Sequence, residues 1–239
     1  MLFRSLHVLL GDQAALPVNA LLYQRLLAGD LADARSMARS LLKSMTLMEF
    51  YDNVAISSLK LAEEDRSAGI LGAERWATLC EHYLEIIADV ADWADGMGGE
   101  KADESAEFGL GRVLCLPARN EGDVVVCMML AQIVERRGAG VITLPGEVTM
   151  SEIAIIDLQP EDVIVISALS TYSPRTTRLI RDLSRPRDAT TVIEARWQRE
   201  DDPAATQEAT GSATRVIVHS IASVVREIER HAQTLPRAR

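Results

Sequence analysis

The chain has 239 residues, of which 48% are hydrophobic and 25% charged, enough for one large or two modest hydrophobic cores. Its net charge of −10 argues against a nucleic-acid partner and against direct lipid binding, because phosphate groups are bound by clustered cations. The longest nearly apolar run, Val124 to Val134, is shorter than the roughly 20 residues that a membrane-spanning helix needs. The composition is typical of a cytoplasmic globular protein, and the three cysteines form no CxxC pair.

Residues 17–95 carry apolar side chains at helical spacing in four successive segments. Thr46, with Glu49 three residues later, has the pattern of a capping box that begins the third helix. The fourth helix extends from about Ala73 to Ala94, and Trp76 on its apolar side is expected in the core. Short connections between amphipathic helices are typical of antiparallel neighbours, so this half of the chain predicts a four-helix bundle.

Five short apolar runs in the second half are predicted strands: Val113–Leu116, Val141–Leu144, Val163–Ser167, Thr190–Ala195 and Arg215–Val218. Four helical patterns separate or follow them: Asp123–Arg137, Met150–Leu158, Pro174–Leu183 and Ile221–Ala232. Apolar strands that alternate with helices indicate a parallel sheet covered on both faces. The predicted fold class is therefore α/β, with an N-terminal four-helix bundle followed by a flavodoxin-like, doubly wound five-stranded parallel sheet. The polar segment Gln198–Ala213 is expected to be loop-like, with room for a short helix.

The sequence divides at a glycine-rich, charged stretch between the two halves. We assign residues 1–95 to a helical bundle domain, 96–111 to a linker and 112–239 to an α/β domain.

Ligands of open parallel sheets bind at the carboxyl ends of the strands. The candidate ligand-binding residues are therefore those that follow the strands: Asn120, Glu121 and Asp123 after the first, Ser167, Ser170, Thr171 and Tyr172 after the third, Glu194 and Trp197 after the fourth, and His219 after the fifth. Together they would line a cleft between bundle and sheet.

The sequence carries no recognisable catalytic or metal-binding motif. A dinucleotide fingerprint needs several glycines after the first strand, where only Gly122 is found. The four histidines are scattered, so we predict no metal site. We therefore expect a protein that is not an enzyme and has no catalytic residue. The alternative is an enzyme that uses Glu121 or Asp123 as general acid and base, although carboxylates also stabilise the first turn of a helix.

A bundle followed by such a sheet is similar to the cobalamin-binding domains, over about residues 25–235. Ser167-Ala168-Leu169 resembles the Ser-x-Leu that this family places after its third strand. The family's turn after the first strand supplies a histidine that ligates cobalt, but the turn from Pro117 to Asp123 has none. Glu194-Ala195 stands where a glycine pair usually opens room for the nucleotide tail. The resemblance implies a degenerate version of this fold in which we expect no cofactor, with cobalamin or haem as the alternative.

The chain also resembles the cytosolic C-terminal domain of autoinducer-2 exporter (PerM-like) membrane proteins. The residues that carry this resemblance are Leu9-Leu10-Gly11-Asp12, Tyr23-Gln24-Arg25-Leu26-Leu27-Ala28-Gly29-Asp30, Glu49-Phe50-Tyr51-Asp52, Leu61-Ala62-Glu63-Glu64-Asp65-Arg66, Met129-Leu130-Ala131-Gln132 and Glu135-Arg136-Arg137-Gly138. It implies a regulatory or assembly domain of a bacterial membrane permease, located at the inner face of the inner membrane. The partners would be the membrane-embedded segments of that permease.

Two functional hypotheses follow. The first is the non-catalytic permease domain, with a small ligand in the cleft between bundle and sheet. The second is a free-standing sensor of cobalamin, haem or a similar tetrapyrrole that lacks the usual histidine ligand. A homodimer formed through a face of the bundle is compatible with either hypothesis.

Overall fold

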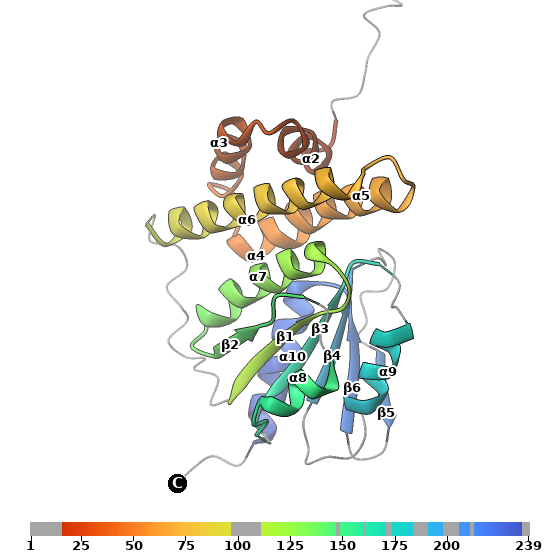
Figure 1. Ribbon diagram of the computed structural model, residues 1–239. Coiled ribbons are helices and arrows are strands. Elements are labelled where there is room, and N and C mark those ends of the chain that lie inside the picture. The colour runs from red at the N-terminus through yellow and green to blue at the C-terminus, as the bar shows by residue number, and fades with distance from the viewer. Residues whose placement is uncertain are drawn as a thin grey trace, which may run out of the picture.

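In a computed structural model, the chain forms a layer of helices stacked on an α/β layer (Figure 1). The structure describes residues 16–96, 111–146, 149–159, 161–170, 174–183, 191–197, 206–210 and 213–235. Within these ranges no helix combines the length and the apolar character needed to cross a bilayer. The arrangement confirms the predicted fold class, a helical bundle followed by an α/β sheet.

The helical layer contains α2 (Val18–Ala28), α3 (Leu31–Leu41), α4 (Leu47–Phe50), the π-helical turn η1 (Tyr51–Ala55), α5 (Ile56–Ser67) and α6 (Ala73–Gly96). The predicted first, second and fourth helices correspond to α2, α3 and α6. The predicted third helix corresponds to α4, η1 and α5 together. Thr46 begins it as expected, since Thr46 Oγ1 accepts a hydrogen bond from Glu49 N and the Glu49 carboxylate accepts one from Thr46 N.

The α/β layer contains the strands β1 (Arg112–Pro117), β2 (Gly140–Thr143), β3 (Val163–Ala168), β4 (Thr191–Arg196), β5 (Thr206–Thr210) and β6 (Ala213–Val218). Its helices are α7 (Glu121–Glu135), α8 (Met150–Ile155), α9 (Pro174–Leu183) and α10 (Ile221–Thr234). Residues 97–110, most of the predicted linker, lie outside the described ranges. The division into two domains stays a prediction.

The five predicted strands are confirmed as a parallel sheet in the flavodoxin-like order β2-β1-β3-β4-β6. One expectation was wrong. Within the segment Gln198–Ala213, expected to be loop-like, residues 206–210 form β5, which pairs antiparallel with β6 at the edge of the sheet. An edge strand of this kind is held by backbone pairing to its neighbour, so its polar sequence carries no apolar pattern by which to recognise it.

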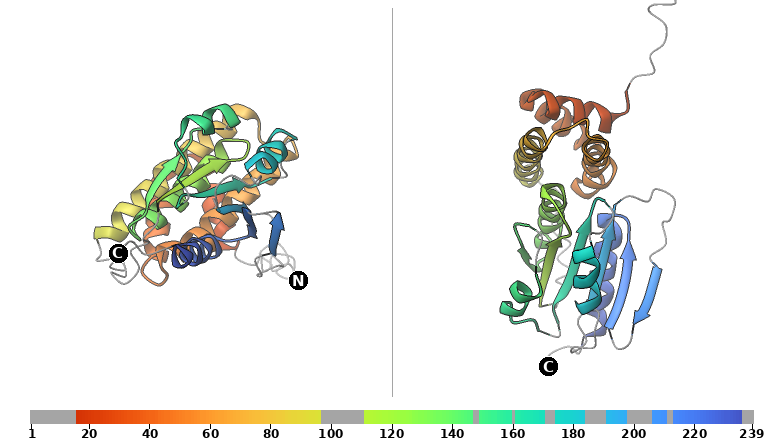
Figure 2. Two further views of the ribbon diagram at one scale, coloured as in Figure 1. Left: turned by 90° about the horizontal axis from the view of Figure 1, so that it is seen from below. Right: turned by 45° about the vertical axis from the view of Figure 1, so that its right-hand side comes forward.

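Two hydrophobic clusters form the core. The larger runs from the bundle through α7 and α10 to one face of the sheet, and the smaller lies on the other face under α8 and α9. Figure 2 shows the bundle beyond one end of the strands, with α8 and α9 on one side of the sheet and α10 on the other. Helices α5 and α6 contact α7, and η1 contacts α10. The bundle is therefore packed on the α/β layer through one continuous core.

The π-helical turn η1 lies at this contact. It closes i→i+5 hydrogen bonds, so the side chains around it leave the helix in directions that a regular α-helix would not give. The Tyr51 hydroxyl donates to Gln132 Oε1 on α7. The Asp52 carboxylate accepts hydrogen bonds from the first backbone N–H groups of α10, 2.6 Å from Ile221 N and 3.1 Å from Ala222 N. Two adjacent side chains of the bundle thus reach two different helices of the α/β layer.

Asp162, at the start of β3, is a fully buried carboxylate that joins β3 to β1. Its Oδ1 accepts from Arg112 N at 2.6 Å, and its Oδ2 accepts from Arg112 Nη2 at 2.7 Å and from Gln159 N at 2.9 Å. Burial raises the pKa of Asp162, but these hydrogen bonds and the guanidinium outweigh burial and hold the pKa below its ordinary value. A methyl group on Gly111 would lie 2.5 Å from Asp162 Oδ1, which makes glycine necessary there.

Replacing Asp162 with alanine is expected to lower the free energy of unfolding by roughly 2–3 kcal/mol at pH 7, since two backbone N–H groups lose a charged acceptor. Because the folded pKa lies below the unfolded value of about 4, the part of this stabilisation that depends on the ionised carboxylate is present above pH ~4 and is lost as the pH falls through the folded pKa. Urea unfolding at pH 7 and at pH 3 measures the difference between wild type and variant. A difference of the same size at both pH values would contradict the account.

Candidate functional site

The candidate site is built around the first turn of α7, which follows β1 at the carboxyl edge of the sheet. Asn120 is the N-cap residue, and its Oδ1 accepts from Gly122 N at 2.9 Å and from Asp123 N at 3.4 Å. Asp123 Oδ2 accepts in return from Asn120 N at 3.2 Å. An Asn followed three residues later by an Asp is a local pattern that satisfies the free N–H groups of a helix start.

Asp123 does more than cap α7. Its side chain is buried, with 1% of the residue exposed, and its Oδ1 accepts from Leu169 N, in the segment after β3, at 2.7 Å. Burial raises the pKa of Asp123 to about 7, against the lowering effect of hydrogen bonds from the backbone at Leu169, Asn120 and Arg119. The carboxylate therefore joins two carboxyl-edge segments and exchanges its proton near neutral pH.

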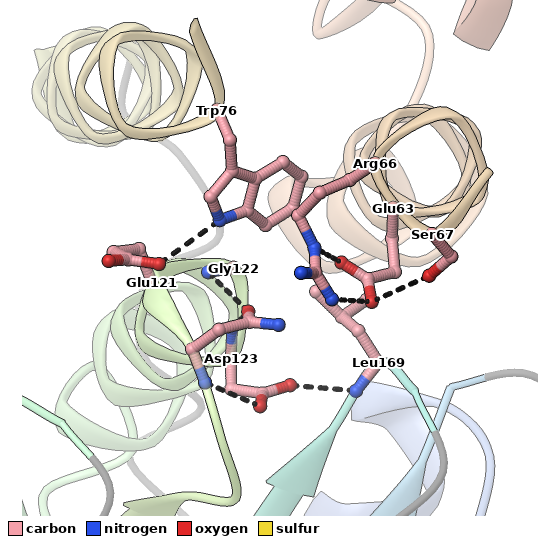
Figure 3. A network of polar contacts seen from close by, with 9 residues as sticks. Glu63, Arg66, Ser67, Trp76, Glu121, Gly122, Asp123 and Leu169 are labelled. Atoms are coloured by element: carbon pink, nitrogen blue, oxygen red, sulfur yellow. Dashed lines mark hydrogen bonds and ion pairs between the residues drawn. The ribbon is translucent and has the colours of Figure 1, made fainter. Parts of the chain in front are cut away.

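Side chains from the bundle complete the site, as Figure 3 shows. Trp76 Nε1 donates to Glu121 Oε2 at 3.1 Å, and the Arg66 guanidinium carbon lies 5.3 Å from the centroid of the Trp76 ring. Arg66 donates in turn to both oxygens of Glu63, at 2.7 and 2.6 Å. Glu63 is only 3% exposed, so the carboxylate of this ion pair is buried, while the Arg66 side chain is half-buried.

Gly122 brings the backbone of α7 against the bundle. A methyl group on Gly122 would lie 2.7 Å from Trp76 Cζ2 and 2.8 Å from Leu169 Cδ1. Such distances are shorter than van der Waals contact, so glycine is required for this approach. Trp76 from the bundle and Leu169 from the segment after β3 thus both pack against the first turn of α7 at Gly122.

Trp197 fills the interior at the carboxyl ends of β3 and β4. The residue is 1% exposed, its Nε1 donates to Ser167 Oγ at 2.9 Å, and its backbone N donates to Ala168 O at 3.1 Å. Ser167 is likewise 1% exposed. The indole therefore ties the end of β4 to the end of β3.

The remaining predicted site residues are distributed differently. Glu194 is fully buried on the side of β4 that packs with Val192 under α8 and α9, and it forms ion pairs with Arg196 and Arg215. His219 Nδ1 lies 2.7 Å from Arg196 O. Ser170 is half-buried. Thr171 and Tyr172 lie outside the described residues. The structure thus brings Asn120, Glu121 and Asp123 together at one end of α7, places the linked pair Ser167 and Trp197 behind them, and puts Glu194 on the other face of the sheet.

Sequence reasoning did not assign Glu63, Arg66 or Asp52 to the site. Trp76 was expected as a core residue, and at 3% exposed it is one. Glu63 could have been noticed from the sequence, since it lies beside apolar positions of its helix. A carboxylate at such a position is expected to be buried, and a buried charge needs a partner. Asp52 gives no such signal, since the N–H groups that it binds lie 169 and 170 residues further along the chain.

A surface pocket of about 330 Å³ lies in the bundle, between α2 and α6. Leu26, Leu79, Glu74 and Arg75 contribute to its lining, together with His82, whose Nδ1 lies 2.8 Å from Leu26 O. None of its lining residues belongs to the predicted cleft. Within the described ranges, no group of three or more His, Cys, Asp or Glu residues is placed to hold a metal ion.

The residues at the carboxyl edge do not fit a base-off cobalamin, the cofactor suggested by the cobalamin-binding-like architecture. The turn between β1 and α7 offers no histidine to cobalt. Trp197 fills the interior at the end of β4, next to the Glu194-Ala195 pair that replaces the expected glycines. The direct contact of Trp76 with Gly122 leaves no layer between the bundle and the start of α7 for a planar ring.

Comparison with known proteins supports the fold and goes no further. No family model matches the chain, and no curated protein matches it. The resemblance to exporter proteins thus gains no support. Among solved structures, the monomethylamine corrinoid protein of Methanosarcina barkeri matches with a TM-score of 0.60 and 11% sequence identity, covering 89% of this chain and 97% of that one. At this identity the match establishes a shared architecture, so the chain has the helical-bundle and α/β fold of a corrinoid protein.

Proposed function

We propose that the chain is a non-catalytic regulatory or assembly domain in which contacts between its own side chains stand where a corrinoid protein of this fold would hold its ligand. The observation that carries the proposal is the packing of Trp76 and Leu169 against Gly122, which joins bundle and sheet directly. Asp52 provides a second contact between bundle and sheet, because its carboxylate accepts hydrogen bonds from the first backbone N–H groups of α10. In a regulatory or assembly domain, such a contact would carry a change in one layer to the other.

The hydrogen bonds of the carboxylates support a non-catalytic role. Both oxygens of Asp123 accept from backbone N–H groups, Glu121 accepts from Trp76, and the buried Glu194 is held between two arginines. A general acid or base must reach a substrate proton. The buried Asp123 and Glu194 serve the structure instead.

The place of this domain in a cell is part of the proposal and rests on the sequence resemblance alone. The domain would belong to a bacterial membrane permease at the inner face of the inner membrane, with the membrane-embedded segments of the permease as partner and no nucleic acid or lipid bound directly. Immunoblotting of membrane and soluble fractions from the cell of origin tests this part. Recovery only in the soluble fraction would overturn it and leave the regulatory role to be judged on its own test.

Titration of the purified chain with hydroxocobalamin and with haemin tests the central proposal. We expect the absorbance maxima of both ligands to remain those of the free ligands, and native mass spectrometry to give the bare mass of the chain. A corrinoid protein that carries the cobalt-ligating histidine is the positive control for the first ligand. A stoichiometric spectral shift together with a bound mass would replace this proposal with the alternative, a tetrapyrrole sensor.

A further inference from the structure

Two buried carboxylates lie near one guanidinium, that of Arg66, at the contact between bundle and sheet. Glu63 and Asp123 are 3% and 1% exposed, and Arg66 donates to both oxygens of Glu63. In the described parts of the chain, Asp123 receives hydrogen bonds from the backbone N–H groups of Asn120 and Leu169, while the guanidinium is engaged by Glu63. A buried carboxylate held by neutral donors is costly to ionise, because burial removes the hydration of its charge.

Asp123 is also positioned to act on the contact mechanically. Its Oδ1 holds Leu169 N at 2.7 Å. The side chain of the same Leu169 packs at Gly122, where Trp76 of the bundle also packs. The carboxylate therefore holds the backbone of a residue that packs beside the contact between bundle and sheet, and it becomes exposed to water if bundle and sheet separate.

We propose that Asp123 is a proton-responsive group that couples the docking of the bundle on the sheet to pH, with the docked state holding a proton that the separated state releases. This inference deepens the proposed function, on which it rests, by naming pH as the condition that controls the contact between bundle and sheet. The proton would take the regulatory part that a bound ligand takes in other proteins.

The direction of the effect follows from the environment of Asp123. Burial raises the pKa of Asp123 to about 7 in the docked state. In the separated state the pKa returns to the ordinary value of about 4. Docking is therefore most favoured at low pH and weakens as the pH rises from about 4 to about 7, by up to about tenfold per pH unit for one proton.

Other charged and titratable groups face Asp123 from three helices: Glu63 and Arg66 on α5, Cys80 on α6, and Glu121 and the buried Cys127 on α7. Hydrogen bonding to Glu63 raises the pKa of Arg66, so the guanidinium keeps its charge. Burial raises the pKa of Cys80, so the thiol stays neutral. Glu121 is exposed at the same helix turn, which makes it the matched control.

Hydrogen–deuterium exchange of the full chain between pH 5 and 8, corrected for intrinsic exchange rates, tests the proposal. In wild type we expect protection of the peptides covering residues 63–79 and 120–135 to fall by up to about tenfold per pH unit between pH 5 and 7. Asp123→Asn should remove this dependence, whereas Glu121→Gln should retain it. Protection independent of pH in wild type, or an unchanged dependence in Asp123→Asn, would overturn the proposal.

A carbon-13 NMR titration of the Asp123 carboxyl in wild type tests the proposal even if the asparagine variant does not fold. A midpoint near 7 supports the proposal, and a midpoint below 5 defeats it. This titration is independent of the proposed function, because tetrapyrrole binding would overturn the latter without moving the Asp123 midpoint measured in the absence of ligand.

Discussion

Replacing Trp197 with alanine is expected to lower the free energy of unfolding by about 3–5 kcal/mol, the usual cost of removing a buried tryptophan. The indole is 1% exposed, belongs to the larger hydrophobic cluster and donates to Ser167 Oγ at 2.9 Å. Its removal would leave a cavity at the ends of β3 and β4 and a hydroxyl without its donor. Guanidinium unfolding followed by far-UV circular dichroism measures the loss without relying on tryptophan fluorescence.

Two milder variants separate the contributions of packing and hydrogen bonding. Trp197→Phe keeps most of the ring and removes the Nε1 donor, so we expect it to cost far less than the alanine variant. Ser167→Ala should cost about 1 kcal/mol in wild type and less in the phenylalanine background, because the bond to Trp197 Nε1 is then already lost while the one to the Cys127 thiol remains. A cost below about 1 kcal/mol for Trp197→Ala would show that the ring is not core, and would reopen this space to a ligand.

The second large loss of stability is expected from replacing Trp76, at the contact between bundle and sheet. Trp76→Ala should lower the free energy of unfolding by about 3–5 kcal/mol, since it removes a buried indole together with its contacts to Arg66 and Glu121. Gly122→Ala in wild type should cost about 1–3 kcal/mol, because the new methyl group would lie 2.7 Å from the Trp76 ring.

The two substitutions combined should show a change of sign. Without the indole, Leu169 is the nearest remaining neighbour of the new methyl group, and the end of its flexible side chain can move. Alanine is favoured over glycine inside a helix by about 1 kcal/mol, so Gly122→Ala should be neutral or stabilising in the Trp76→Ala background. Denaturant unfolding of the four proteins gives the coupling. Additive effects would mean that Trp76 and Gly122 do not touch, and would remove the observation on which the proposed function depends.

The elements that the sequence predicted well are those defined by neighbouring residues. The capping box of Thr46 and Glu49 lies within one helical turn, and both of its hydrogen bonds are present. The apolar runs of β1, β3 and β4 are buried along almost their whole length, which is why they stand out from their surroundings. Strand β5 has no such pattern, because its pairing with β6 uses the backbone. The turn η1 also escapes prediction, since one widened turn leaves helical spacing nearly unchanged.

The sequence by itself therefore determined the order of the main helices and of the five parallel strands, and the absence of a histidine in the turn before α7. Only the tertiary structure determined the burial, the hydrogen-bond partners and the pKa of Asp123. From sequence it is a first-turn acid of α7. In the fold, a backbone N–H 46 residues away and a buried Glu63 surround it, and burial raises its pKa to about 7. The physical reason is that hydrogen-bond patterns of single helices and strands are local, whereas desolvation and contact depend on residues that only folding brings together.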